Sequence, residues 1–309
     1  MNTINKLLLG GAAILAAAFS SCSDGKENLT PGPAYKNYFA VEDSDNSPEA
    51  QIRREFFNNS GVYLLFNDTL AVYTDEYGRP KTETVDFDWN LTGDLETGAS
   101  WSFLTTVEDK RKASEIVQKY FLPYVSGKGC PFKPFSILLV TDLTKPDRYD
   151  DPVDIAYLSC WRCFAINVTD WLEADASEMK TLTRELLYEL VNGSFSTLDK
   201  NLSDFYAISD DYYYERIYRQ FPDWLDDQDP ELVYDLGFLS YDKDSWDEAD
   251  YDYFWDDQHD AKEYLRCVIV GDEAEFIGKW ADYPKIMQKY YIMKECVMNL
   301  GINFDNQAE

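Results

Sequence analysis

The amino-acid sequence predicts an α+β fold in a single domain, with a mixed sheet formed early in the chain and helices late. Short apolar or alternating runs typical of strands lie before residue 170, whereas patterns of helical period dominate from residue 176 onwards. No second linker, internal repeat or low-complexity block follows Tyr38. We therefore expect one folded domain over residues 37–309.

The composition excludes several classes of function. The 309 residues include 28 Lys and Arg, 57 Asp and Glu and one histidine, which gives a formal net charge of −29. Such a chain repels a polyphosphate, so we expect no nucleic-acid partner. A single histidine, His259, rules out any site in one chain that needs two imidazoles. The hydrophobic content of 45% is ordinary for a globular protein.

The N-terminus resembles a bacterial lipoprotein signal. Lys6 precedes an uncharged run over residues 7–19, which is shorter than the about 20 residues of a membrane-spanning helix and fits a secretory signal. Ser20 and Ser21 before Cys22 resemble a lipobox, although Phe19 stands where leucine is usual. We expect a signal peptide over 1–21 and lipidation of Cys22. An ordinary cleaved signal, with Cys22 as a bystander, is the alternative.

Residues 22–36 predict a flexible tether. Polar residues are followed by proline and glycine, and such segments stay extended and mobile. Several acyl chains on Cys22 would anchor the domain stably to a membrane. The acidic start of the segment resembles surface-export signals of some glycan-foraging Gram-negative bacteria. We therefore expect an outer-membrane location, facing the periplasm or the cell surface.

The first elements of the domain are a helix and three strands. Ser47 is a typical N-cap for a helix over 48–57, which Gly61 ends. The apolar run 62–66 predicts a strand that pairs with 69–74 across a short turn. Strict alternation over 85–91 predicts a half-buried strand.

Helices dominate the later elements. We expect a helix over 108–121, which Pro123 stops, then strands over 135–141 and 165–168. An amphipathic helix follows over 176–191, with Gly193 at its end. The last helix has Pro284 in its first turn and Gly301 past its end.

The cysteines favour a structural role. Cys160 and Cys163 form a CxxC motif, which is typical of zinc or redox sites. A zinc site needs a second pair of ligands, and a redox motif opens a helix, whereas 164–168 continues as a strand. We therefore favour buried or disulfide-bonded cysteines. The pairing stays open among Cys130, Cys160, Cys163, Cys267 and Cys296, and at least one of these five is unpaired.

An acidic and aromatic segment covers residues 242–260. Asp242 and Asp244 begin a calcium-loop pattern, but Trp246 and Asp247 break it. We favour a solvated acidic face interleaved with core aromatics. Sugar stacking on exposed rings is the alternative.

Arg184, Glu185 and Tyr188 lie in the middle of the amphipathic helix. Residues 184 and 188 are one turn apart and share a face. Their spacing is that of His-Glu-x-x-His, in which two imidazoles bind zinc and the glutamate activates water. Neither histidine is present.

Several segments, in order along residues 35–305, resemble a family of zinc metallohydrolase-like lipoproteins associated with outer-membrane import systems of the starch-utilization type. They are 52–57, 61–70, 204–209, 236–240, 246–248, 280–286 and 300–305. The resemblance implies a zincin-like domain. In that fold a mixed sheet lies over the His-Glu-x-x-His helix, and a downstream acid is the third zinc ligand.

By position, Arg184 and Tyr188 replace the two histidines of that family, Glu185 matches the water-activating glutamate, and Asp252 matches the downstream acid. A guanidinium repels Zn²⁺, and a phenol is a poor ligand at neutral pH. The resemblance therefore implies no zinc cofactor and no catalytic residue. We expect Arg184 to pair instead with Asp252, or failing that with Glu185, and Tyr188 to donate its hydroxyl to the same cluster.

The function that the resemblance implies is a non-catalytic binding or structural component of an outer-membrane nutrient importer, with importer proteins and a glycan or peptide as partners. An active hydrolase that uses carboxylates or a residual metal is one alternative. A glycan-binding surface lipoprotein is the other.

Overall fold

The computed structural model describes residues 36–75, 77–87, 98–245 and 248–304. The chain divides into two compact units, Met1–Asn37 and Tyr38–Glu309, and the fold below is that of the second unit. Cys22, the signal peptide, most of the tether, Trp246 and Asp247 lie outside the described residues. Within the described ranges, no helix combines the length and apolar character needed to cross a membrane.

The centre of the fold is a six-stranded mixed sheet. Strand β5 pairs in parallel with β1 and β8, β7 pairs antiparallel with β8, and β4 and β6 pair antiparallel with β5. The bounds are β1 Tyr63–Leu65, β4 Ser100–Phe103, β5 Ser136–Pro146, β6 Pro152–Asp154, β7 Tyr157–Ser159 and β8 Phe164–Asn167. The predicted early mixed sheet is confirmed.

Alternation along β5 gives the sheet two buried faces. Ile137 and Leu139 belong to the main hydrophobic cluster, which includes residues of the covering helices. Leu138 and Val140 belong to a second cluster, with Phe39 on the opposite face. Successive side chains of a strand point to opposite faces, so one apolar run fills both layers.

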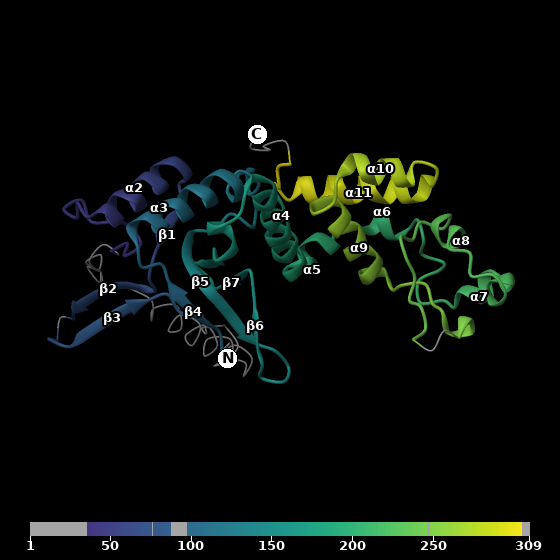
Figure 1. Cartoon of the computed structure of the whole chain (residues 1–309), viewed down its shortest axis with the longest axis horizontal. Coiled ribbons are helices and arrows are strands. Elements are labelled where there is room, and N and C mark those ends of the chain that lie inside the picture. The colour runs from purple at the N-terminus through teal and green to yellow at the C-terminus, as the bar shows by residue number, and fades with distance from the viewer. Residues whose placement is uncertain (1–35, 76, 88–97, 246–247, 305–309) are drawn as a thin grey trace, which may run out of the picture. The chain divides into compact units, whose positions relative to one another are not determined.

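Helices α2 and α3 cover one face of the sheet, as Figure 1 shows. Helix α2 spans Pro48–Ser60 and α3 spans Val107–Ile116, which continues as a π-helix, η2, over Val117–Phe121. The Ser47 hydroxyl accepts a hydrogen bond from the Ala50 amide at 3.2 Å, and Gly61 follows α2 at φ +70°. The predicted first helix is confirmed, and it runs on to Ser60.

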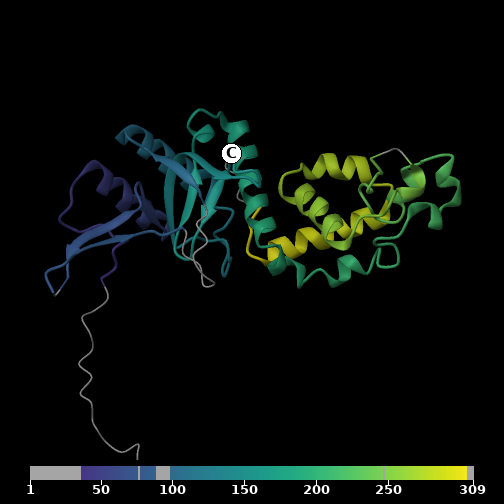
Figure 2. The same cartoon turned by 90° about the horizontal axis from the view of Figure 1, so that it is seen from below.

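The remaining helices follow the sheet in sequence, as predicted. Helix α4 packs against α9, and α9 packs against α11 (Figures 1 and 2). The bounds are η3 Asp170–Leu172, α4 Ala176–Gly193, α5 Phe195–Asp199, α6 Ser203–Tyr206, α7 Ile217–Gln220, η4 Pro222–Leu225, α8 Glu231–Tyr234, η5 Ala249–Tyr251, α9 Asp257–Ile269, α10 Glu273–Trp280 and α11 Pro284–Asn299.

The predicted pairing of the strand over 62–66 with the strand over 69–74 is wrong. Strand β2, Thr69–Thr74, forms a separate two-stranded sheet with β3, Pro80–Thr84, and does not pair with β1. The Asp75 carboxylate accepts hydrogen bonds from the Tyr77 and Arg79 amides, which fixes the β2–β3 turn. Residues Leu64 and Leu65 of β1 are buried, which suits a parallel partner inside the sheet.

The predicted strand over 85–91 is absent from its described part, 85–87. Val85 and Phe87 are buried and Asp86 is exposed, so the alternation is real. The alternation arises because the Val85 and Phe87 side chains pack against the sheet, although residues 85–87 pair with no strand. Residues 88–91 lie outside the described ranges.

We expect Asp175→Ala to destabilise the domain by about 1 kcal/mol, because it removes the N-cap of α4. The Asp175 carboxylate accepts hydrogen bonds from the Ser177 and Glu178 amides at 2.8 and 3.0 Å. Urea unfolding measures the loss. Asp175→Asn keeps the acceptor and should lose little, so equal losses in the two variants would contradict the capping role.

Candidate functional site

Helix α4 carries the three residues that match the zinc-binding motif by position. A capping box, in which Asp175 and Glu178 each accept a hydrogen bond from the other's backbone amide, begins the helix. Met179, Leu186 and Leu190 bury its apolar stripe in the main cluster. Arg184, Glu185 and Tyr188 are half-buried. Because α4 packs against α9, the contacts of these three residues involve that helix and its C-terminal end.

Arg266 of α9 joins Glu185 and Tyr188. Its Nη1 and Nη2 atoms donate to the two carboxylate oxygens of Glu185 at 3.0 and 2.6 Å. This two-point geometry is the strongest form of an arginine–carboxylate pair. The Arg266 guanidinium carbon lies 5.0 Å from the centroid of the Tyr188 ring, within cation–π range.

Arg184 bonds to the end of α9 rather than to an acid. Its Nη1 donates to the carbonyl oxygens of Val270 and Gly271 at 3.4 and 2.8 Å. Val270 caps α9 and Gly271 follows it, so both carbonyls lie at the negative end of the helix dipole, and a guanidinium satisfies them without a carboxylate. Its Nε is buried with no hydrogen-bond partner among the described residues.

The predicted pairing of Arg184 with Asp252 is wrong. Asp252 is 1% exposed, and its carboxylate accepts hydrogen bonds from Trp224 Nε1 and the Asp244 amide, both at 2.9 Å. The second choice, Glu185, pairs with Arg266 instead. Tyr188 packs on that same guanidinium, so the expected cluster of Arg184, Asp252 and Tyr188 does not form.

The acidic and aromatic segment is divided between core and surface. Phe254 is 1% exposed in a third hydrophobic cluster with Trp224, whereas Tyr251 is 45% exposed. The ring of Trp255 stacks on His259 with centroids 3.6 Å apart. The core aromatics fit the favoured interpretation, but Asp252 and Asp260 of the same segment are buried and do not belong to a solvated face.

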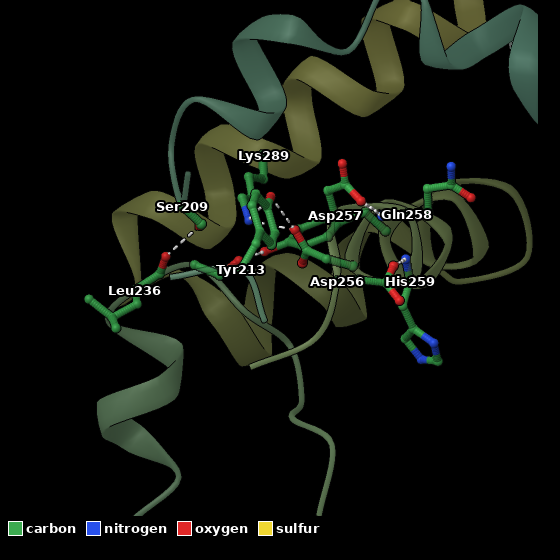
Figure 3. A network of polar contacts seen from close by, with 11 residues as sticks. Ser209, Tyr213, Leu236, Asp256, Asp257, Gln258, His259 and Lys289 are labelled. Atoms are coloured by element: carbon green, nitrogen blue, oxygen red, sulfur yellow. Dashed lines mark hydrogen bonds and ion pairs between the residues drawn. The ribbon is translucent and has the colours of Figure 1, made fainter. Parts of the chain in front are cut away.

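A buried ion pair that sequence reasoning missed lies between α9 and α11. Lys289 Nζ is 2.7 Å from Asp260 Oδ2, and both side chains are 0% exposed. The Tyr213 hydroxyl donates to the same carboxylate oxygen at 2.8 Å. Figure 3 shows Tyr213 beside Lys289 in this network. The rings of Phe205 and Phe238 lie 4.9 and 4.7 Å from the ammonium nitrogen.

Burial shifts the pKa values of Asp260 and Lys289 in the directions that favour their neutral forms. It raises the pKa of Asp260, and Lys289 opposes that rise. It also lowers the pKa of Lys289, and Asp260 opposes that fall. The loss of hydration is the leading cause for each group, so each depends on the other to stay charged.

The sequence does hold a signal for this pair. Lys289 falls on the apolar face of α11, with Ile286, Tyr290 and Met293. Asp260 falls on the apolar face of α9. A lone charge of opposite sign on each of two apolar helix faces indicates a buried partner, because an isolated buried charge is very costly.

The five described cysteines are free thiols. Cys130 and Cys163 are buried, and Cys160, Cys267 and Cys296 are half-buried. A cavity of about 390 Å³ lies beside the sheet, with Cys160, Trp161, Arg162 and Asp86 in its wall. No group of three or more Cys, His, Asp or Glu side chains in the described ranges could hold a metal ion, and the absence of zinc stays a prediction.

Comparisons with protein families, curated proteins and solved structures found no match for this chain.

We expect Lys289→Met to destabilise the domain by about 3–5 kcal/mol, because it leaves Asp260 buried without its cation. Lys289→Met/Asp260→Asn should recover most of that loss. Lys294→Met is the control, because Lys294 lies on the same helix as Lys289 and forms a partly exposed ion pair with Glu273 of α10. This change should lower the unfolding free energy by under about 1 kcal/mol. Unfolding in guanidinium chloride measures all three.

The same variants give a pH test. The raised pKa of Asp260 means that the folded state holds this proton more tightly than the unfolded chain does. The stability of Lys289→Met should therefore fall as pH rises above about 4, the ordinary value for an aspartate. The double variant lacks the Asp260 carboxylate, so its stability should depend less on pH. An equal dependence of stability on pH in the two variants would contradict the assignment of this effect to Asp260.

Proposed function

We propose that this chain is a membrane-anchored lipoprotein with a zincin-like domain that has lost catalysis. In this proposal it is a binding or structural component of an outer-membrane nutrient import system. The observation that carries it is the contact between α4 and α9. Arg184, Glu185 and Tyr188, which match the zinc-binding motif by position, all hold these two helices together.

Hydrolysis by a zincin-type site needs a glutamate that accepts a proton from a metal-bound water. Both carboxylate oxygens of Glu185 accept hydrogen bonds from Arg266. Arg184 replaces, by the family resemblance, the first zinc-binding histidine, and its guanidinium donates instead to the Gly271 carbonyl oxygen. These contacts support a structural role for the helix.

The anchoring part of the proposal rests on the N-terminus. The uncharged run 7–19 followed by Ser20, Ser21 and Cys22 supports export and lipidation. Residues 22–36 would supply a tether long enough to hold the domain away from the membrane surface. The importer and its glycan or peptide cargo come from the family resemblance alone.

The test of the lost catalysis is Glu185→Gln. If Glu185 is structural, this change should lower the unfolding free energy by about 0.5–1 kcal/mol, because the partly exposed ion pair with Arg266 becomes a neutral contact. Turnover of peptide and glycoside substrates should stay at the blank level before and after the change. Well under one zinc ion per chain should remain after dialysis against a mild chelator.

Glu189→Gln, one turn along the same helix, is the control for the loss of an acid from α4. About one zinc per chain, with turnover that Glu185→Gln abolishes, would overturn the proposal.

The test of anchoring is the mass of the N-terminal peptide from detergent-extracted protein. We expect acyl chains on a cysteine that begins the mature chain at residue 22. Cys22→Ala should release the protein from the outer-membrane fraction. Unchanged membrane binding and processing of Cys22→Ala would contradict the anchor while leaving the conclusion on catalysis in place.

A further inference from the structure

Strands β7 and β8 place the two cysteines of the CxxC motif opposite each other. Their antiparallel register pairs Leu158 with Ala165 and Ser159 with Phe164. The next pair outward is Cys160 and Cys163. The Cys160 amide donates to the Cys163 carbonyl oxygen at 2.9 Å, so the pairing continues to these two residues. Trp161 and Arg162 are the two residues of the turn.

The two thiols lie on the same face of the sheet. Side chains of directly opposed residues in an antiparallel pair point to one face. Cys163 belongs to the buried cluster on the face that holds Leu138 and Val140, and Cys160 packs against that cluster. Opposed residues have Cα atoms about 4.5–5.5 Å apart, which lies within the range of about 4.4–6.8 Å found in disulfides.

The two cysteines differ in access. Cys163 is 2% exposed, and burial, together with the neighbouring Cys160, raises its pKa to about 12. Cys160 is half-buried and forms part of the wall of the 390 Å³ cavity. A reagent in solution therefore meets Cys160 first, and Cys163 is placed to react with whatever Cys160 has bound.

We propose that Cys160 and Cys163 form a reversible disulfide across this turn, by exchange with a low-molecular-weight disulfide such as oxidised glutathione. The Cys160 thiolate attacks one glutathione sulfur, which makes a mixed disulfide and releases one glutathione thiolate. The Cys163 sulfur then gives up its proton and attacks the Cys160 sulfur, which releases the second glutathione. Two protein thiols are oxidised, one glutathione disulfide is reduced, and the two protons end on two glutathione thiols.

The bond would fix the turn rather than stabilise the whole domain. A disulfide that closes so short a loop removes little entropy from the unfolded chain. The turn carries Trp161, which is 72% exposed, and Arg162, whose guanidinium carbon lies 4.5 Å from the centroid of the Phe39 ring. These residues and Cys160 line the cavity, so oxidation locks one wall of it.

Trypsin gives a direct test, because it cleaves after Arg162, between the two cysteines. The full chain is incubated with oxidised and reduced glutathione, alkylated and digested. We expect peptides 149–162 and 163–180 to be joined until a reductant is added, with Cys130, Cys267 and Cys296 alkylated. Cys296→Ala is the matched control and should form the same link.

Two variants test the order of the steps. Cys163→Ala should retain one glutathione on Cys160, because no second thiol displaces it. Cys160→Ala should leave Cys163 unmodified. In the wild-type chain, alkylation of both cysteines after oxidation, a lasting glutathione adduct on Cys160, or a link to another cysteine would overturn the proposal. The test uses the pure protein, so its failure leaves the proposed function untouched.

Discussion

The buried pair of Lys289 and Asp260 sets the position of α9, on which the arrangement of the helices depends. Two charges with no exposure to water are tolerated only if each lies within hydrogen-bond reach of the other. Tyr213 supplies a further donor to the carboxylate from the segment before α7. Three distant parts of the chain must therefore come together at one point, and a shift of α9 along α11 would break the pair.

With α9 fixed, its other side meets α4. Arg266 reaches Glu185 and Tyr188 from the last turn of α9, and the carbonyl oxygens of Val270 and Gly271, just past its end, accept from Arg184. These contacts use charge and hydrogen bonding to fasten two helices that also pack through apolar side chains. A helix with the spacing of a zinc-binding motif thus acts as a packing element, which is the physical basis of the proposed loss of catalysis.

The sheet imposes a second constraint, which acts on the cysteines. Strand β5 fills both buried layers, so β8 beside it and β7 beyond have fixed registers. That register brings Cys160 opposite Cys163 at the end of the hairpin. The same pairing explains why the motif does not open a helix, since β8 begins directly after Cys163.

By itself the sequence determined the α+β order, the helix starts at the Ser47 cap and at Pro284, and the shared helix face of Arg184 and Tyr188. These features depend on residues within a turn or two of one another, so local patterns contain them. Only the tertiary structure decided that β2 pairs with β3, that Arg184 bonds to the end of α9, and that Lys289 meets Asp260. The partners of Arg184 lie more than eighty residues along the chain, and a side chain's pattern does not specify which of many distant acids or carbonyls the fold will bring within reach.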